Sequence, residues 1–348
     1  MKKSNLVLLV IVVVLTIIVV TLYFRNNVDK QSVLRDFAVE DTARITKIFL
    51  ADKNDNSVKL EKIDGVWYVN DIYKARKDFI NVLLTTIKNV EVNAPVPEAS
   101  LDKVLKELSV KGIKTEIYQD DKLVKTYYVG GVTQNSTGTY MILEGSDLPF
   151  VMHIPGFAGY LTVRYLPDVK EWRERIIFNY RFENIAKVIV DYGKNPSDGF
   201  ILHNYGDNKY GVVRADESAV DFLVDTVAIK EYLSAIKFIA YEALISENLQ
   251  KHKLDSLSKE PMIAKFEIED KKGNSKSFKI YYRQNVNIVV DEQGIPYDWD
   301  VDRLYGIVNN DTEVVFLQYY VLDPITKTIN DFNLNRPKPK PLYEGFVK

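Results

Sequence analysis

The sequence predicts an α+β protein in which an N-terminal transmembrane helix precedes two related units of antiparallel sheet, each with helices packed on one side. Three observations lead to this prediction. A long uncharged apolar run opens the chain, pairs of similar segments recur in the same order after it, and strand-like and helix-like periodicities alternate within each recurrence.

The N-terminal run is the strongest single feature. Residues 6–24, LVLLVIVVVLTIIVVTLYF, contain no charge and follow Lys2 and Lys3. At about 1.5 Å per residue the run spans roughly 28 Å, enough to cross a hydrocarbon core of about 30 Å. No small-residue cleavage site follows, which favours an uncleaved anchor over a signal peptide. The short basic N-terminus predicts a cytoplasmic tail, a single pass through the inner membrane and a periplasmic bulk of the chain.

The rest of the chain contains an internal duplication. The matched segments are ITKIFL at 45–50 with IAKVIV at 185–190, KLVKTYYV at 122–129 with KSFKIYYR at 276–283, and YMILEGSDLPFVM at 140–152 with LYGIVNNDTEVVF at 304–316. Between them lie two helical patterns with apolar residues at i, i+3, i+4 and i+7, namely Ile80, Leu83, Leu84 and Ile87, and Ile229, Tyr232, Leu233 and Ile236. Each unit is long enough to bury a core.

These patterns divide the chain into five parts. We expect a tail and anchor at 1–24, a polar stalk at 25–42, a first α+β unit at 43–178, a second, diverged α+β unit at 179–333 and a Pro/basic tail at 334–348.

Composition excludes several classes of protein. The 46 Lys+Arg and 48 Asp+Glu leave a net charge of −2, which argues against a nucleic-acid binder. The chain has no cysteine, so disulfides, thiolate metal sites and cysteine nucleophiles are excluded. No zinc-protease helix or nucleophile elbow is present. We therefore expect no catalytic, metal or cofactor residues.

Several runs in the first unit resemble a known family. They are FAVEDTARITKIFLADKNDNSVKLEK, GVWYV at 65–69, YKARKDFI, VNAPVPEA at 92–99, YYVGGVTQNSTGTYMILEG and PFVMHIPGFAGYLTVRYLPDVKEWRER. Together they resemble the bacterial family catalogued as domain of unknown function 4340, especially its Bacteroidetes-type members, over roughly residues 37 to 178. The resemblance implies an envelope protein with an N-terminal anchor, and some relatives are associated with transporters linked to gliding motility. It supplies no catalytic residues.

Three loops imitate ligand sites. KTYYVGGVTQNSTGTYMIL at 125–143 is glycine-rich, but Thr139 stands where a phosphate loop needs lysine, so a connecting turn is favoured. Asp52, Asn54 and Asn56 imitate half of a calcium loop, and a hairpin turn is favoured there. Asp298, Asp300 and Asp302 fall on one side of an extended chain. A solvated face is the favoured interpretation of these three acids, and a calcium site is the alternative.

The joint between the units is the better candidate for function. Arginines and large aromatic residues alternate there, and this combination is enriched where proteins bind proteins. The candidate partner-binding residues are Arg164, Tyr165, Trp172, Arg173 and Arg175. The alternative is that they join the two units, with the arginines paired to acids.

The sequence thus predicts a non-catalytic, membrane-anchored binding or scaffold protein. Its partners would be the membrane, through the N-terminal helix, and another envelope or transporter protein, with no nucleic acid and no cofactor. One alternative is an accessory subunit of a transporter or gliding-type machine. A second is a glycan- or peptidoglycan-acting enzyme that uses a carboxylate pair between the units.

Overall fold

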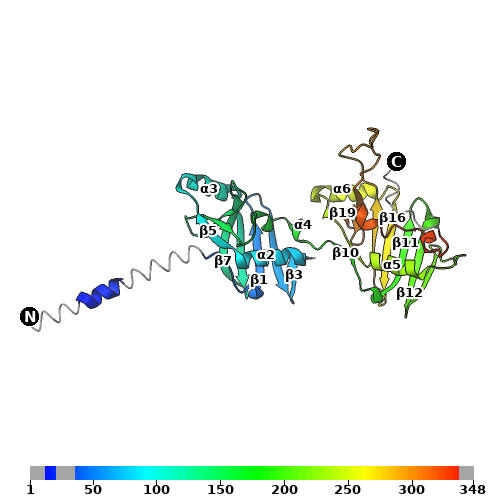
Figure 1. The fold of residues 1–348 in the computed structure, drawn as a ribbon, viewed down its shortest axis with the longest axis horizontal. Coiled ribbons are helices and arrows are strands. Elements are labelled where there is room, and N and C mark those ends of the chain that lie inside the picture. The colour runs from blue at the N-terminus through cyan, green and yellow to red at the C-terminus, as the bar shows by residue number, and fades with distance from the viewer. Residues whose placement is uncertain (1–11, 21–35, 337–348) are drawn as a thin grey trace, which may run out of the picture. The chain divides into compact units, whose positions relative to one another are not determined.

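The computed structural model describes residues 12–20 and 36–336 and confirms a mixed α+β fold built on antiparallel sheets (Figure 1). The chain divides into two compact units, Met1–Glu174 and Arg175–Lys348. Each unit contains one large sheet with helices against it, and the second unit also contains a two-stranded sheet.

Part of the predicted membrane anchor is described. Residues 12–20 are helical and exposed, whereas 6–11 and 21–24 lie outside the described residues. Within residues 12–20 and 36–336, none of the helices combines the length and the apolarity that crossing a membrane requires.

The sheet of the first unit has nine strands in the order β4-β3-β2-β1-β6-β7-β8-β9-β5. Every neighbouring pair is antiparallel, and strands such as β6 alternate buried with half-buried residues, as one packed face requires. The strands are β1 Ile45–Ala51, β2 Ser57–Ile63, β3 Val66–Val69, β4 Tyr73–Lys74, β5 Glu91–Pro95, β6 Ile113–Gln119, β7 Lys122–Val132, β8 Thr139–Leu143 and β9 Phe150–His153, and the helices are α2 Lys77–Asn89, α3 Glu98–Lys111 and α4 Val169–Trp172.

The large sheet of the second unit has eight strands in the order β13-β12-β11-β16-β17-β18-β19-β15, and β10 pairs separately with β14. Its strands are β10 Ile176–Asn179, β11 Ile185–Tyr192, β12 Phe200–Gly206, β13 Lys209–Arg214, β14 Phe238–Ala240, β15 Ala243–Leu244, β16 Ala264–Asp270, β17 Ser275–Tyr281, β18 Arg303–Val308 and β19 Glu313–Gln318, and its helices are α5 Thr226–Ile236, α6 Glu247–Leu257 and α7 Tyr319–Leu322.

The order of strands repeats from one unit to the other. Read across the sheet, the order β13-β12-β11-β16-β17-β18-β19-β15 of the second unit corresponds strand by strand to β3-β2-β1-β6-β7-β8-β9-β5 of the first. Among the described strands of these two large sheets, β4 is the one without a counterpart. A bulge also recurs at the same place, between Ile45 and Lys47 in β1 and between Ile185 and Lys187 in β11. Because a bulge adds one residue to one strand of a pair, it accounts for the lysine that interrupts each apolar run.

Pairing registers confirm the first segment match and correct the other two. The match of 45–50 with 185–190 holds, since Ile48 pairs with Leu60 and Ile117 where Val188 pairs with Leu202 and Ile268. The second match aligned Tyr127 with Tyr281. However, Tyr127 pairs with Thr115 of β6, and the residue that pairs with the equivalent position of β16 is Phe278. Likewise Met141 is equivalent to Gly306 and not to Tyr305. This last error is a slip of one residue, which exchanges the two faces of a strand.

Helices cover both faces of each sheet, which corrects the prediction of helices on one side. In β8, Met141 belongs to the core under α2, whereas Ile142 belongs to a separate cluster under α3. In β19, Val315 belongs to the core under α5, whereas Val314 belongs to the cluster under α6. Neighbouring residues of a strand point to opposite faces, so the two helices of each unit lie on opposite sides of its sheet.

The predicted stalk at 25–42 ends earlier than expected. Phe37 is 1% exposed and packs edge-on against Phe150, and Val39 donates its backbone N–H to the carbonyl of Ile87 at 3.1 Å. The segment from residue 37 therefore belongs to the core of the first unit. Residues 25–35 of the predicted stalk lie outside the described residues.

The other predicted boundaries also move by a few residues. Arg175 belongs to the second unit, because its carbonyl accepts the N–H of Tyr241. At the start of the predicted tail, Leu334 donates to the carbonyl of Leu223 at 2.8 Å and Arg336 pairs with Asp225 at 2.8 Å. Residues 334–336 thus close the second unit, and 337–348 lie outside the described residues.

A buried tyrosine pair lies in the core of the first unit. The hydroxyls of Tyr127 and Tyr165 lie 3.1 Å apart, and both side chains are fully buried. Burial raises the pKa of Tyr165 to about 12 and that of Tyr127 well above its usual value. Both hydroxyls therefore stay protonated at neutral pH and share one hydrogen bond.

This pair predicts a non-additive response to mutation. Either Tyr127→Phe or Tyr165→Phe alone leaves a buried hydroxyl without its partner, and each is expected to lower the free energy of unfolding by about 1–3 kcal/mol. The double variant removes both hydroxyls and is expected to cost less than the sum. Urea unfolding at pH 7.5 measures all three variants, and simple additivity would contradict the pairing.

Candidate binding face of the second unit

Three of the five residues predicted to bind a partner are buried inside the first unit. Tyr165 is fully buried, and Trp172 is buried edge-on against Phe79 and donates its indole N–H to the carbonyl of Leu166 at 2.7 Å. Arg173 is 8% exposed and lies 3.5 Å over the ring of Tyr73. These three side chains pack within the end of the first unit and are not exposed at its surface in this structure.

The two remaining candidates are half-buried and lie in different units. Arg164 donates to the hydroxyl of Thr86 at 2.9 Å and covers the ring of Phe157. Arg175 donates to the carbonyl of Glu242 in the second unit. Their side chains are held by local contacts, and the structure does not gather the five candidates into one surface.

The glycine-rich segment is a connecting turn, as favoured from its sequence. Gly130 lies within β7, where a Cβ atom would come within 2.7 Å of Leu108 in α3, so glycine permits the close packing of this helix. The turn itself is closed by Thr133, whose N–H donates to the carbonyl of Gly138 and whose hydroxyl accepts the N–H of Gly138. Its polar groups are used within the turn.

The two calcium-like loops are also ordered by their own contacts. Asp52 accepts the backbone N–H groups of Asn54 and Asn56 in the turn between β1 and β2, which confirms a hairpin there. Among the described residues, no three His, Cys, Asp or Glu side chains gather in a way that could hold a metal ion.

The three aspartates near residue 300 do not share one face. Asp300 is 7% exposed, forms an ion pair with Arg283 and accepts the backbone N–H of Arg303 at 2.8 Å, whereas Asp298 and Asp302 are exposed. Asp300 therefore closes the base of the loop that joins β17 to β18. The neighbouring Arg303 donates to both carboxylate oxygens of Glu242, and this hydrogen bonding raises the pKa of Arg303.

The loop between β17 and β18 is the main difference between the two units. We call residues 282–302 the excursion. In the first unit the equivalent strands β7 and β8 are joined by the short turn at 133–138, whereas the excursion is a long projecting hairpin (Figure 1). Isolated bridges join Gln284 to Trp299 and Val290 to Pro296 along it.

Two polar side chains organise the excursion from within. Asn285 accepts the N–H of Val289 and donates to the carbonyls of Val289 and Tyr297. Asp291 accepts the N–H groups of Gln293 and Ile295 at the tip. These contacts give the loop a defined conformation and leave its apolar side chains pointing outward.

The excursion exposes an unusual amount of apolar surface. Eight large apolar side chains are at least 38% exposed, with Ile288 at 69%. They are Val286, Ile288, Val289, Val290, Ile295, Tyr297, Trp299 and Val301. Contiguous exposed apolar patches on soluble domains mark interaction sites more often than isolated residues do.

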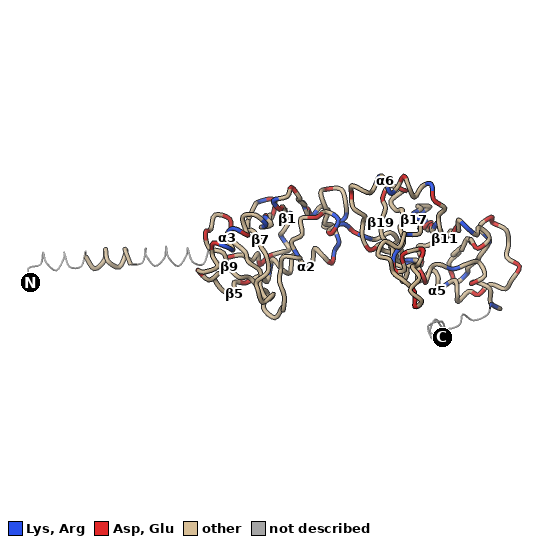
Figure 2. The backbone as a smooth tube through the Cα atoms, turned by 90° about the horizontal axis from the view of Figure 1, so that it is seen from above, with Lys and Arg blue, Asp and Glu red and all other residues tan. Residues whose placement is uncertain are grey.

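Charge on the projecting part of the excursion is acidic. Residues 284–302 contain five acids and no lysine or arginine, and one of the five, Asp300, is buried in its ion pair with Arg283 at the base. Elsewhere in the two units basic and acidic residues are interspersed along the chain (Figure 2). Residues 284–302 thus combine exposed apolar side chains with acidic ones and carry no basic side chain.

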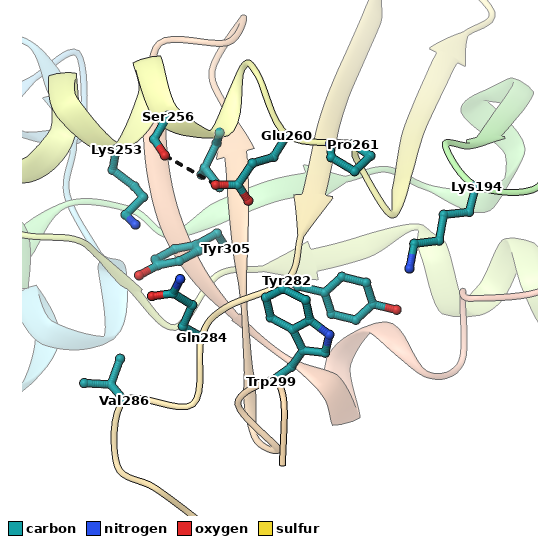
Figure 3. A pocket seen from close by; sticks show the side chains of 11 residues that line it. Lys194, Lys253, Ser256, Glu260, Pro261, Tyr282, Gln284, Val286, Trp299 and Tyr305 are labelled. Carbon is teal, nitrogen blue, oxygen red and sulfur yellow. Dashed lines mark hydrogen bonds between the residues drawn. The ribbon is translucent and has the colours of Figure 1, made fainter. Parts of the chain in front are cut away.

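A hollow of about 370 Å³ lies at the base of the excursion, and we call it the aromatic–lysine pocket. Tyr282 and Trp299 stack at 4.9 Å, and Tyr305 of β18 forms a further aromatic wall (Figure 3). Lys194, which follows β11, and Lys253 of α6 point in from opposite ends, 5.3 Å over Tyr282 and 4.8 Å over Tyr305. Such aromatic walls with a few polar groups are typical of ligand sites.

These features were missed from the sequence, although two signals were present. The second unit has a much longer connection between the strands equivalent to β7 and β8, and this connection carries the run NIVV followed by IPYDW. The aspartates of this connection suggest a metal site, and its apolar residues follow neither helical nor strand periodicity.

The ion pair at the base predicts how the excursion responds to mutation. Asp300→Ala leaves the partly buried Arg283 without its carboxylate, a change that costs about 3–5 kcal/mol for fully buried pairs and less where one partner is partly exposed. We expect faster cleavage of the excursion in limited proteolysis. Asp298→Ala is the matched control, because Asp298 is exposed in the same loop, and it should cleave like the wild type. Equal cleavage of both variants would contradict the role of the pair.

Comparison with protein families matches residues 67–257, from β3 of the first unit to the end of α6 in the second, to the family described as "Domain of unknown function (DUF4340)". The match starts later than the resemblance seen in the sequence and extends further into the second unit. No curated protein and no solved structure matches the chain. Because the family match covers more than half of the residues, the chain belongs to the family of domain of unknown function 4340.

Proposed function

We propose that the chain is a single-pass, membrane-anchored protein of the bacterial envelope whose periplasmic part binds another envelope protein and performs no catalysis. The observation that carries this proposal is the apolar surface of the excursion. Eight exposed large side chains on one ordered loop cost free energy in water, at roughly 25 cal/mol for each Å² left uncovered. A protein partner that covers the loop would recover this free energy.

The charge of the excursion indicates the kind of partner. Its acids, which include Asp291, Glu292 and Asp298, are repelled by anionic lipid headgroups, so the loop is poorly suited to insertion into the bilayer. They complement a partner groove that is apolar in its centre and basic at its rim. If the anchor helix also contacts the partner, the chain would be an accessory subunit of a transporter or gliding-type machine.

Backbone strain adds to this argument. Ile288 has a φ of +50°, a conformation that is a genuine outlier for a β-branched residue. Such strain costs of the order of 1–3 kcal/mol and clusters at functional sites. Since Ile288 is largely exposed, packing within the chain does not explain the choice of isoleucine, whereas contact with a partner would.

The described part of the N-terminal run supports the anchor. Residues 12–20 form a helix of apolar residues with one polar side chain, Thr16, whose hydroxyl donates to the carbonyl of Val12 at 2.8 Å. A helix that is apolar on all sides is suited to a protein interior or a membrane. The polar group of Thr16 is satisfied within the helix, as a hydrocarbon environment requires.

The partner surface can be tested by cross-linking in native membranes. A photo-reactive amino acid replaces Ile288 or Ile295, and each variant is expected to form one adduct of defined mass with an envelope protein. The control is the same substitution at Ile72, which lies in the first unit and is equally exposed. No adduct from the excursion, or the same adduct from Ile72, would contradict the proposal.

The anchor can be tested separately. Alkaline phosphatase, which needs its disulfides to form, is fused after Lys348 and is expected to be active and to sediment with membranes. Deletion of residues 6–24 should leave the fusion inactive in the cytoplasm. Activity in the deleted form, or a soluble full-length fusion, would contradict the predicted anchor and orientation.

A further inference from the structure

The aromatic–lysine pocket has the dimensions of a small-molecule site and belongs to the second unit alone. Its volume of about 370 Å³ falls within the range of roughly 300–1,000 Å³ that is common for ligand pockets. Tyr282 and Trp299 come from the excursion, and the first unit has a tight turn at the equivalent place. The pocket is therefore an addition to the shared architecture and not a by-product of it.

Flat apolar walls define one part of the pocket. The rings of Tyr282 and Trp299 stack at 4.9 Å with 21° between their planes, and Trp299 is 42% exposed. Tyr305 stacks on Phe316 at 5.7 Å, which fixes the second wall. Rigid aromatic faces bind flat or ring-shaped molecules with little loss of side-chain entropy.

Positive charge defines the ends. Neither Lys194 nor Lys253 forms an ion pair with any residue of 12–20 or 36–336, and each ammonium group rests over an aromatic ring that faces the hollow. Glu260 is the one carboxylate in the lining, and it accepts a hydrogen bond from Ser256 at 3.3 Å. Two lysines against one acid favour a ligand that carries a negative charge.

Hydrogen-bonding groups lie between these ends. The side-chain amide of Gln284 points into the hollow near Tyr305 (Figure 3) and makes no hydrogen bond to the described part of the chain. Ser256 and Glu260 face it from the helix side. An amide, a hydroxyl and a carboxylate that line one pocket can bind several hydroxyl groups of one ligand.

We infer that the aromatic–lysine pocket binds an acidic saccharide. Its ring would stack on the exposed face of Trp299, its hydroxyls would bond to Gln284 and Glu260, and its carboxylate or phosphate group would bind Lys253 or Lys194. The pocket shares Val286 and Trp299 with the apolar surface proposed for the protein partner, but its other lining residues lie outside that surface, so a saccharide can be tested without the partner.

The experiment uses the full chain in detergent, titrated with three acidic probes, namely tri-galacturonate, N-acetylmuramic acid and glucose 6-phosphate. At least one is expected to bind saturably in calorimetry, with affinity that falls as salt is added. Trp299→Leu keeps the apolar volume but removes the flat ring and should weaken binding about tenfold or more. Lys253→Gln should weaken binding about five- to tenfold.

Matched controls distinguish the outcomes. Lys230 lies 5.7 Å over Tyr210, outside the pocket in the same unit, and Lys230→Gln should leave the affinity unchanged. Maltotriose tests the need for charge, and tri-glutamate tests the need for a sugar. The inference is overturned if all three acidic probes fail to bind, if either control compound binds as tightly as the best probe, or if Trp299→Leu binds normally.

Discussion

In each unit two helices pack on opposite faces of the sheet, and this packing holds the strands between them in register. In β8, one of two consecutive residues packs under α2 and the next under α3. In β19, one packs under α6 and the next under α5. The registers of β8 and β19 are therefore fixed by two helices at once, and a slip of one residue in either strand would exchange their partners. The repeated bulges at Lys47 and Lys187 keep β1 and β11 within this arrangement. Shared strand order together with a shared bulge is what duplication of one unit predicts.

Much of the fold could be predicted from local periodicity, and the errors have definite causes. The helices at Ile80 and Ile229 follow from four apolar residues at helical spacing, because one face of each packs on a sheet. The match near Tyr127 slipped by three residues because a YY pair occurs in both segments but at different positions of β7 and β17. The match near Tyr140 slipped by one residue because β8 and β18 have apolar residues on both faces. The apolar pairs MI and VV in β8 and β19 already signalled two buried faces, but residue type alone does not show which helix each residue meets.

The candidate site was less predictable, because it depends on a comparison between the two units. Arginine and aromatic residues near the joint resemble an interface in sequence, yet Trp172 and Arg173 are buried against Phe79 and Tyr73. Conversely, the excursion has neither strand nor helix periodicity, and its apolar residues stay exposed because Asn285 and Asp291 hold the backbone from within. Burial and exposure at these places follow from tertiary contacts that no local pattern records.

We propose that the excursion makes the second of two related α+β units a binding unit. A swap in the full chain replaces residues 282–302 by residues 131–137, which join the equivalent positions Gly130 and Gly138 of the first unit. Because the flanking strands are topologically equivalent, the variant should keep its circular dichroism spectrum and cooperative unfolding while its complex in native membranes falls to the mass of the chain alone. A folded variant that remains in a complex of wild-type mass would contradict the account.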